Sequence, residues 1–307
     1  MKFLVTGGAG FIGSNIAERL VKEKHFVRVL DNFSSGKHDN LKFPVELIEG
    51  DIRNKSTCDK ACEGMDYVIH QAALRSVPGS LKDPDSYNDV NIQGTLNLLQ
   101  AAAKHKVKRF VFASSSSIYG DTDKFPQQET DLPLLISPYA LSKLTGEYYC
   151  RIFSEFFNLE TVCLRYFNVF GPRQALDDEY AVVIPKFINC VLNDQQPPIF
   201  GTGKQSRDFV YIDNVVDANI LAATKAGVSH DIFNVASGVD TTVLDIVTTL
   251  NKITGKSIQP KLLPIRAGDV FRTLADISKI KAKLGYQPTV TFTEGLKCAV
   301  SYFNDFF

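Results

Sequence analysis

The first half of the chain alternates short apolar runs with longer amphipathic segments. The apolar runs predict strands at residues 2–6, 26–30, 45–49, 66–70, 108–113 and 160–166. The longer segments predict helices near residues 11–22, 54–61, 85–104 and 138–157. Strands that alternate with helices form a parallel sheet with helices on both faces. The pattern therefore predicts an α/β fold with a Rossmann-type, doubly wound parallel sheet.

The pattern changes after about residue 167, where Pro and Gly become frequent and the elements become shorter. This change predicts a first domain at residues 1–166, which holds the parallel sheet, and a smaller α/β lobe at 167–307 that closes over it. Two further strands are expected at Asp208–Ile212 and Ile232–Val235. They leave open a return of the chain to the first domain near residues 207–235.

Charge and composition exclude several classes of protein. Lys plus Arg number 34 and Asp plus Glu number 34, and this balance argues against a nucleic-acid or anionic-membrane partner. The chain has neither an apolar run of membrane-spanning length nor the start of a signal peptide. Its six cysteines are scattered, and Cys58 and Cys62 lack the second pair of a zinc site. We expect a cytoplasmic protein with reduced thiols and no metal.

Three glycines spaced three residues apart, Gly7, Gly10 and Gly13, follow the first strand and open the first helix. Glycine is needed where the backbone turns tightly and approaches a pyrophosphate, and a helix N-terminus offers N–H groups to the phosphates. Asp31 ends the next strand, where a carboxylate can bond a ribose 2′-hydroxyl and repel a 2′-phosphate. The pattern predicts a dinucleotide site that favours NAD over NADP, although Asp31 also suits an ordinary turn.

Tyr139 and Lys143 are four residues apart and share one face of a predicted helix, which Ser137 and Pro138 begin. A nearby positive charge lowers the pKa of a tyrosine from its usual value near 10. Such a pair can act as a general base near neutral pH. The spacing alone is more typical of a surface helix. It indicates a catalytic pair only together with the glycine motif and the serine run at 114–117.

Other polar residues follow the predicted strands at the same edge of the sheet, where doubly wound folds bind ligands. They are Asp51, His70, Gln71, the serine run and Asn168. The second lobe adds the cations Arg173, Lys204, Arg207 and Arg266, and a guanidinium suits bidentate contacts with a phosphate. A single surface arginine is more often simply solvated.

With these motifs the chain resembles the extended short-chain dehydrogenases/reductases, and within them the UDP-glucose/UDP-N-acetylglucosamine 4-epimerases. The resemblance covers essentially the whole chain. It rests on residues 6–13, 31–36, 50–52, 70–73, Asn91, 114–120, 138–143, 164–172, 201–203, 206–210 and 266–270. It implies an isomerase that uses NAD, acts on a UDP-sugar and passes through a transient 4-keto sugar.

The resemblance also implies a role for each site residue. Tyr139 would take the proton of the sugar 4-hydroxyl, Lys143 would hold the phenolate and the nicotinamide ribose, and Ser115 would bond the 4-oxygen. Ser116 or Ser117 could share the last role. NAD would contact Gly7, Gly10, Phe11, Ile12, Gly13, Asp31, Asn32, Ser35, Gly36, Asp51, Ile52, Gln71, Ala72, Ala73, Asn91, Tyr139, Lys143 and Phe167. The UDP-sugar would contact Ser76, Ser115, Ser116, Asn168, Val183, Phe200, Arg207, Arg266, Asp269 and Thr273.

Several alternatives differ in specific residues. Sugar 4,6-dehydratases carry an Asp-Glu pair where this chain has Ser116 and Ser117, and the decarboxylases carry a glutamate there. UDP-glucuronate 4-epimerases remain the second candidate, although they usually carry a Gly-Pro-Trp-Gly-Arg-like stretch where this chain has residues 171–174. A net oxidoreductase that releases NADH also stays open. A non-catalytic NAD sensor is disfavoured, because the Tyr139/Lys143 pair is kept.

Two finer expectations concern the sugar and the assembly. In the resemblance, Thr273 lies beside the sugar C2 substituent, where a small residue admits an N-acetyl group; Ser76 also fits N-acetylated sugars. We therefore expect UDP-GlcNAc/UDP-GalNAc as substrates, alongside UDP-Glc/UDP-Gal.

Helices 85–104 and 138–157 carry apolar residues on more than one face. Related proteins pair these helices in a four-helix bundle, which implies a homodimer; the alternative is that both faces serve the monomer core.

Overall fold

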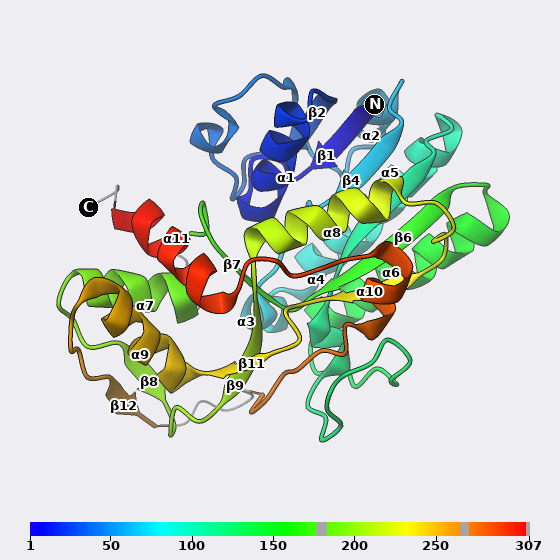
Figure 1. Cartoon of the computed structure of the whole chain (residues 1–307). Coiled ribbons are helices and arrows are strands. Elements are labelled where there is room, and N and C mark those ends of the chain that lie inside the picture. The colour runs from blue at the N-terminus through cyan, green and yellow to red at the C-terminus, as the bar shows by residue number, and fades with distance from the viewer. Residues whose placement is uncertain (176–182, 265–269, 305–307) are drawn as a thin grey trace.

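A seven-stranded sheet forms the centre of the computed structural model, which describes residues 1–175, 183–264 and 270–304 (Figure 1). Its strand order is β10-β6-β5-β4-β1-β2-β3, and every neighbouring pair is parallel. The strands are β1 (Lys2–Thr6), β2 (Phe26–Asp31), β3 (Glu46–Glu49), β4 (Tyr67–His70), β5 (Arg109–Ser115), β6 (Glu160–Tyr166) and β10 (Ile232–Val235). The expected Rossmann-type α/β fold is confirmed.

Helices cover both faces of this sheet. On one face α1 (Phe11–Lys22) packs against α8 (Ile212–Thr224). On the other face α2 (Lys55–Cys62), α5 (Thr95–Lys104) and α6 (Pro138–Phe156) contact one another in sequence. The short elements η1 (His38–Leu41), α3 (Val77–Lys82) and η3 (Ser116–Tyr119) follow β2, β4 and β5. The loops that follow the strands therefore gather at one edge of the sheet.

The helix expected at residues 85–104 has three consecutive parts. They are α4 (Pro84–Tyr87), the π-helical segment η2 (Asn88–Gly94) and α5. π-Helical turns are rare and occur often at functional sites. Here the Thr95 hydroxyl donates to the Asn91 carbonyl at 2.6 Å, which gives a backbone oxygen in this segment a side-chain partner.

A smaller lobe follows β6. It contains a three-stranded sheet of β7 (Asn168–Phe170), β9 (Ser206–Tyr211) and β11 (Asp240–Thr242), and a two-stranded sheet of β8 (Pro198–Phe200) and β12 (Lys261–Leu263). Its helices are α7 (Val183–Leu192), α9 (Val243–Thr254) and α11 (Phe292–Asn304), whereas α10 (Ser278–Leu284) packs on β10 and α8 beside the central sheet. The chain does recross, because β10 pairs with β6 and α8 packs on α1, whereas β9 stays in the small sheet. The division at residue 166 stays a prediction.

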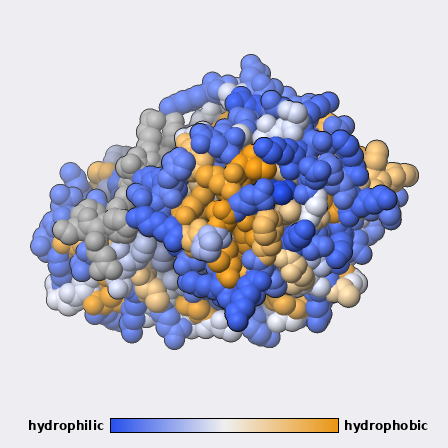
Figure 2. Space-filling model, turned by 90° about the horizontal axis from the view of Figure 1, so that it is seen from above, coloured by the Kyte–Doolittle hydropathy of each residue, from blue (hydrophilic) through white to orange (hydrophobic). Residues whose placement is uncertain are grey.

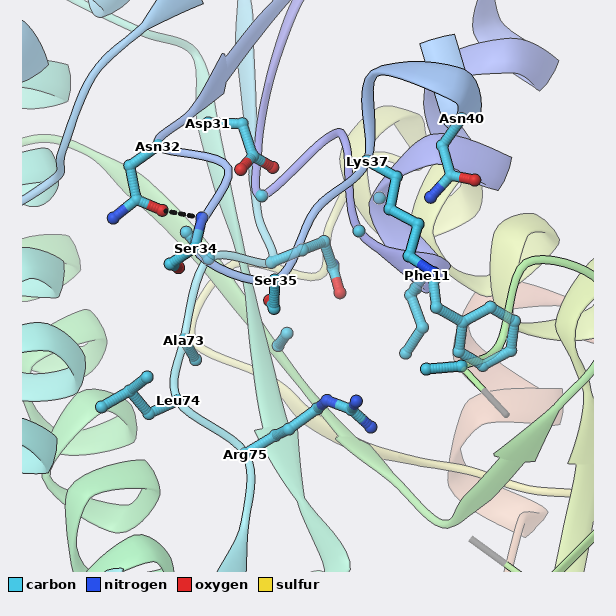
Figure 3. A pocket seen from close by; sticks show the side chains of 18 of the residues that line it. Phe11, Asp31, Asn32, Ser34, Ser35, Lys37, Asn40, Ala73, Leu74 and Arg75 are labelled. Carbon is cyan, nitrogen blue, oxygen red and sulfur yellow. Dashed lines mark hydrogen bonds between the residues drawn. The ribbon is translucent and has the colours of Figure 1, made fainter. Parts of the chain in front are cut away.

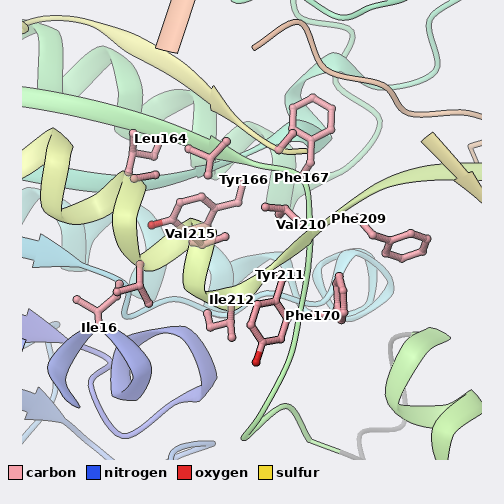
Figure 4. Close-up of a cluster of buried hydrophobic side chains, with 14 of the residues drawn as sticks. Ile16, Leu164, Tyr166, Phe167, Phe170, Phe209, Val210, Tyr211, Ile212 and Val215 are labelled. Atoms are coloured by element: carbon pink, nitrogen blue, oxygen red, sulfur yellow. The ribbon is translucent and has the colours of Figure 1, made fainter. Parts of the chain in front are cut away.

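Two apolar clusters hold the layers together. One lies between the sheet and the α2–α5–α6 layer and includes Leu98 and Leu99, both fully buried. The other joins the two lobes, and Figure 4 shows side chains of α1, β6, β7, β9 and α8 packed side by side in it, among them Ile16, Tyr166 and Ile212. Because this second cluster is continuous, the small lobe is anchored to the sheet that positions the site.

On the face in Figure 2, apolar residues gather near the centre and hydrophilic residues surround them. Among the described residues, none of the helices combines the length and the apolar character that crossing a membrane requires. The six cysteines form no disulfide, and all except Cys298 are buried.

Candidate active site

A cavity of about 1020 Å³ opens at the carboxyl ends of β1, β2, β4 and β5. Its wall contains fifteen of the residues to which the sequence assigns cofactor contacts. They are Gly7, Gly10, Phe11, Ile12, Gly13, Asp31, Asn32, Ser35, Asp51, Ile52, Gln71, Ala72, Ala73, Tyr139 and Lys143. Figure 3 shows the part of the cavity lined by the loops after β2 and β4. Residues far apart in the chain thus meet where a doubly wound fold binds its ligand.

The glycine loop explains how a nucleotide could approach the backbone. Gly7 has φ +65°, and a Cβ there would lie 2.7 Å from the Ala72 amide nitrogen. A Cβ on Gly13 would lie 2.2 Å from the Gly7 carbonyl oxygen, so the first turn of α1 can sit directly on the loop only with glycine there. No side chain caps the start of α1 at Gly10. Its first N–H groups are therefore available to an anion, and the loop fits a dinucleotide diphosphate.

Asp31 ends β2 and is buried at the rim of this loop. Its carboxylate accepts hydrogen bonds from the Ala9 amide at 2.9 Å and the Phe33 amide at 2.8 Å. A Cβ on Gly36 would meet the Ala9 Cβ at 2.8 Å, so the loop after β2 packs closely on the glycine loop. This packing fixes the carboxylate in the cavity wall, where it can accept from a ribose hydroxyl.

Asp51 lines the cavity just after β3. The Arg53 guanidinium donates to both of its oxygens, at 3.0 and 2.7 Å, and the Asn32 amide adds a bond of 2.9 Å. The Arg53 hydrogen bond is the largest cause that holds the pKa of Asp51 at about 2. Asp51 is therefore a permanent carboxylate, and a hydrogen-bond acceptor, at all physiological pH values.

Tyr139 and Lys143 lie on the first two turns of α6, as predicted, with Ser137 as the N-cap and Pro138 in the first turn. Lys143 is buried, and its Nζ donates to the Ala113 carbonyl of β5 at 2.8 Å. The same Nζ lies 5.9 Å from the centre of the Tyr139 ring. Ser115, two residues after Ala113, hydrogen-bonds the Tyr139 phenol. The three predicted catalytic side chains thus come together at the carboxyl end of β5.

The sequence predicts a lowered pKa for Tyr139, but its surroundings in the protein raise it. Burial raises the pKa of Tyr139, and the nearby Tyr87 acts in the same direction, while the Ser115 hydrogen bond and the charge of Arg75 oppose them. The ammonium of Lys143 is directed at the Ala113 carbonyl, and its own pKa is lowered to about 8 by burial. Arg75, rather than Lys143, is the cation that favours the phenolate here.

Glu147 continues the contact between α6 and β5 one turn after Lys143. It accepts from Ser114 at 2.5 Å and from two nitrogens of Arg165 at 2.9 and 2.8 Å. Both charged side chains are almost completely buried, and Arg165 also stacks over the Tyr119 ring. Ala113, Ser114 and Ser115 are therefore each bonded to α6, and this fixes the register of the helix against the strand.

Three expected cofactor residues lie outside the cavity wall. Gly36 packs behind Asp31. The Asn91 side chain bonds both backbone groups of Leu74, at 2.8 and 2.9 Å. Phe167 is buried with its ring 6.1 Å from that of Tyr119. Their cofactor roles stay predictions.

The expected sugar-nucleotide residues are distributed over several elements, and none of those that the structure describes lines this cavity. Ser76 caps α3 by accepting from the Gly79 amide at 2.9 Å. Asn168 and Arg207 lie on the adjacent strands β7 and β9, and the Thr273 amide donates to Ser206 of β9 at 3.2 Å. Ser115 and Ser116 follow one another at the end of β5, Val183 begins α7 and Phe200 ends β8. Arg266 and Asp269 lie outside the described residues.

Sequence reasoning missed several residues of the cavity wall. They include Lys37, Asn40, Arg53 and Arg75. Figure 3 shows the Lys37 and Arg75 side chains pointing into the cavity. Asn40 is positioned by its bond to the Ala9 carbonyl at 2.8 Å. The sequence could have indicated these residues, because each lies within a few positions of a predicted cofactor residue: Gly36, Asp51 or Ala73. The described residues contain no group of three or more His, Cys, Asp or Glu side chains that could hold a metal ion.

The chain matches the model of the NAD dependent epimerase/dehydratase family over residues 3–236. It belongs to this family. A UDP-glucose 4-epimerase from Mycolicibacterium smegmatis is 36% identical over 315 residues, which cover 99% of each chain. The structure of a UDP-N-acetylglucosamine 4-epimerase from Methanobrevibacter ruminantium M1, in complex with UDP-N-acetylmuramic acid, is 40% identical with a TM-score of 0.96 and covers 100% of this chain and 99% of its own.

A third relative acts on a different sugar. The structure of a UDP-glucuronic acid 4-epimerase from Bacillus cereus, in complex with UDP-glucuronic acid and NAD, is 35% identical with a TM-score of 0.92 and covers 100% of both chains. The predictions of the family, of NAD as the cofactor and of an isomerase are therefore confirmed. The relatives differ in their sugars, so similarity alone does not select one for this chain.

Proposed function

We propose that this enzyme interconverts UDP-N-acetylglucosamine and UDP-N-acetylgalactosamine, and also UDP-glucose and UDP-galactose, by inverting C4. The observation that carries the proposal is the meeting of Ser115, Tyr139 and Lys143 at the carboxyl end of β5, beside the glycine-loop cavity. The phenol supplies a proton acceptor, and the cavity supplies a dinucleotide site. Relatives that act on UDP-sugars support the nucleotide part of the substrate.

Each residue of the site is proposed to have a separate role. Bound NAD supplies reversible hydride transfer at the sugar C4. Tyr139 takes the 4-hydroxyl proton and returns it, and Ser115 holds the 4-oxygen within reach of the phenol. Lys143 would bond the nicotinamide ribose. Asn168 and Arg207, with Arg266 and Asp269 outside the described residues, hold the UDP part while the sugar turns over.

The deciding experiment adds no cofactor. Purified protein is incubated separately with UDP-GlcNAc, UDP-Glc and UDP-glucuronate, and the C4 epimers are resolved by proton NMR. Conversion of UDP-GlcNAc to UDP-GalNAc is the expected result, and it would show that NAD stays bound through the cycle. Turnover of UDP-glucuronate alone would establish the second candidate instead. No epimer of any substrate, with NADH released, would replace both by a net redox reaction.

Thr273 is proposed to admit the N-acetyl group because its side chain is small. Its hydroxyl accepts from the Asp208 amide at 3.3 Å, which places the side chain against β9. Thr273→Tyr should therefore lower kcat/KM for UDP-GlcNAc by about 10- to 200-fold, the range for rejecting a poorly fitting group, and leave UDP-Glc within about threefold. Thr273→Val keeps the size and serves as the control. Retained UDP-GlcNAc activity in Thr273→Tyr would show that this residue does not gate the sugar.

A homodimer through α5 and α6 is also proposed. An exposed apolar stripe runs along α6 through Leu141, Tyr148, Ile152 and Phe156. Leu98 and Leu99 of α5 instead serve the monomer core, as the alternative reading of that helix expected. Tyr148→Glu combined with Ile152→Glu should halve the mass measured by light scattering, because charge would be buried in the interface. Leu262→Glu, an exposed site on β12, is the control. A monomeric wild type would remove the proposal.

A further inference from the structure

A buried chain of hydrogen bonds joins three elements behind the cavity wall. His70 ends β4 and is 2% exposed. Its Nδ1 lies 2.7 Å from the Thr6 hydroxyl at the end of β1, and its Nε2 lies 2.9 Å from the Thr95 hydroxyl at the start of α5. Beyond these, the Ala72 amide donates to the Thr6 oxygen at 3.3 Å, and the Thr95 hydroxyl donates to the Asn91 carbonyl at 2.6 Å.

Only one arrangement of protons satisfies the chain. Thr95 gives its single proton to the Asn91 carbonyl, so its oxygen must accept from a protonated Nε2 of His70. A neutral imidazole then has a bare Nδ1, which accepts the Thr6 proton and leaves the Thr6 oxygen to accept from Ala72. Burial lowers the pKa of His70 to about 3, and the charge of Lys143 acts in the same direction, so the ring is neutral at physiological pH.

Both ends of this chain contact the loop from Gln71 to Leu74, which lines the cavity. Ala72 lies in the wall, in the loop from Gln71 to Leu74 that follows β4. Asn91 holds the same loop from the other side, because its side chain donates to the Leu74 carbonyl and accepts from the Leu74 amide. Its amide also donates to Ser142 at 3.0 Å, next to Lys143 on α6. The loop therefore has two supports, and His70 connects them.

We propose that His70 is a positioning residue that holds the loop Gln71–Leu74 and the π-helical segment in the shape that retains NAD. His70 does not line the cavity, and its two ring nitrogens bond Thr6 and Thr95. The π-helical segment carries Asn91, whose carbonyl accepts from Thr95 while its side chain donates to the Leu74 carbonyl. The inference concerns the family's cofactor and does not depend on which sugar the enzyme uses.

The test compares NAD release from two variants of similar chemistry. Thr95→Val removes the hydroxyl that links His70 to Asn91, and His70→Phe removes both ring nitrogens while keeping a flat ring. Thr161→Val is the matched control, because Thr161 is also buried and donates to a helix carbonyl, that of Cys150, at 2.9 Å, away from the cavity wall. Bound NAD is measured after gel filtration at successive times, and Tm is measured in parallel.

We expect Thr95→Val and His70→Phe to release NAD about tenfold faster than the wild type, whereas Thr161→Val loses a similar amount of Tm with unchanged release. KM for the sugar nucleotide should stay within about twofold in all folded variants. If His70→Phe does not fold, Thr95→Val alone decides. Unchanged NAD release in Thr95→Val, or equal acceleration in Thr161→Val, would overturn the proposal, because the chain would then be structural only.

Discussion

Replacing Tyr139 by Phe is expected to lower kcat for C4 inversion by about 100- to 10,000-fold, the range that one general acid–base group contributes. The change removes the phenol and keeps the ring, so the contacts of α6 with β5 through Lys143 and Glu147 remain. The bound NAD content should therefore be unchanged. Proton NMR of the two epimers at saturating substrate measures the rate, and the absorbance of nucleotide released on denaturation measures NAD.

Tyr148→Phe is the matched control, because it lies on the same helix, exposed and outside the cavity wall. It should keep kcat within about twofold. A Tyr139→Phe enzyme with kcat within tenfold of the wild type would mean that another group moves the proton. Ser115 would be the next residue to replace, because it is bonded to the phenol.

Replacing Glu147 by Leu is expected to lower the free energy of unfolding by about 3–5 kcal/mol, the cost of leaving one charge of a buried pair uncompensated. Arg165 would keep its charge in the interior, and Ser114 would lose its acceptor. This is a large part of a total stability of about 5–15 kcal/mol. Urea unfolding followed by circular dichroism measures the change.

Two further variants distinguish the effect of the buried ion pair from a general effect of changing α6. Glu147→Leu combined with Arg165→Met removes both charges, and it should recover most of the lost stability, since apolar replacement of a buried pair is often neutral or stabilising. Glu155→Ala breaks an exposed pair with Arg151 on the same helix and should change little. A single Glu147→Leu variant as stable as Glu155→Ala would show that Arg165 finds another partner or stays solvated.

The sequence by itself determined the parts of this protein that depend on local chemistry. The glycine spacing at residues 7–13 predicted the tight approach of a strand, a loop and a helix, because only glycine permits those contacts. Alternating apolar runs predicted the strands from β1 to β6 and the helices α1, α2 and α6. The Tyr139/Lys143 spacing predicted their shared helical face. These signals are local because backbone geometry sets the helical and strand periods.

The tertiary structure decided what depends on contacts between distant residues. In the sequence, Leu98 and Leu99 fit either a dimer interface or the monomer core; they lie in the core, because α2 and α6 pack around them. The return of β10 to the central sheet depends on pairing with β6, which no local pattern specifies.

The electrostatics of the site is also tertiary. Helical spacing placed Lys143 beside Tyr139, but the Ala113 carbonyl directs its ammonium, and burial raises the phenol pKa. The sequence placed His70 at the ligand edge of the sheet but did not show its hydrogen bonds, because its partners Thr6 and Thr95 are 64 and 25 residues away. A residue type can be read from the sequence, whereas the environment that sets its charge and its hydrogen bonds exists only once the strands and helices have packed.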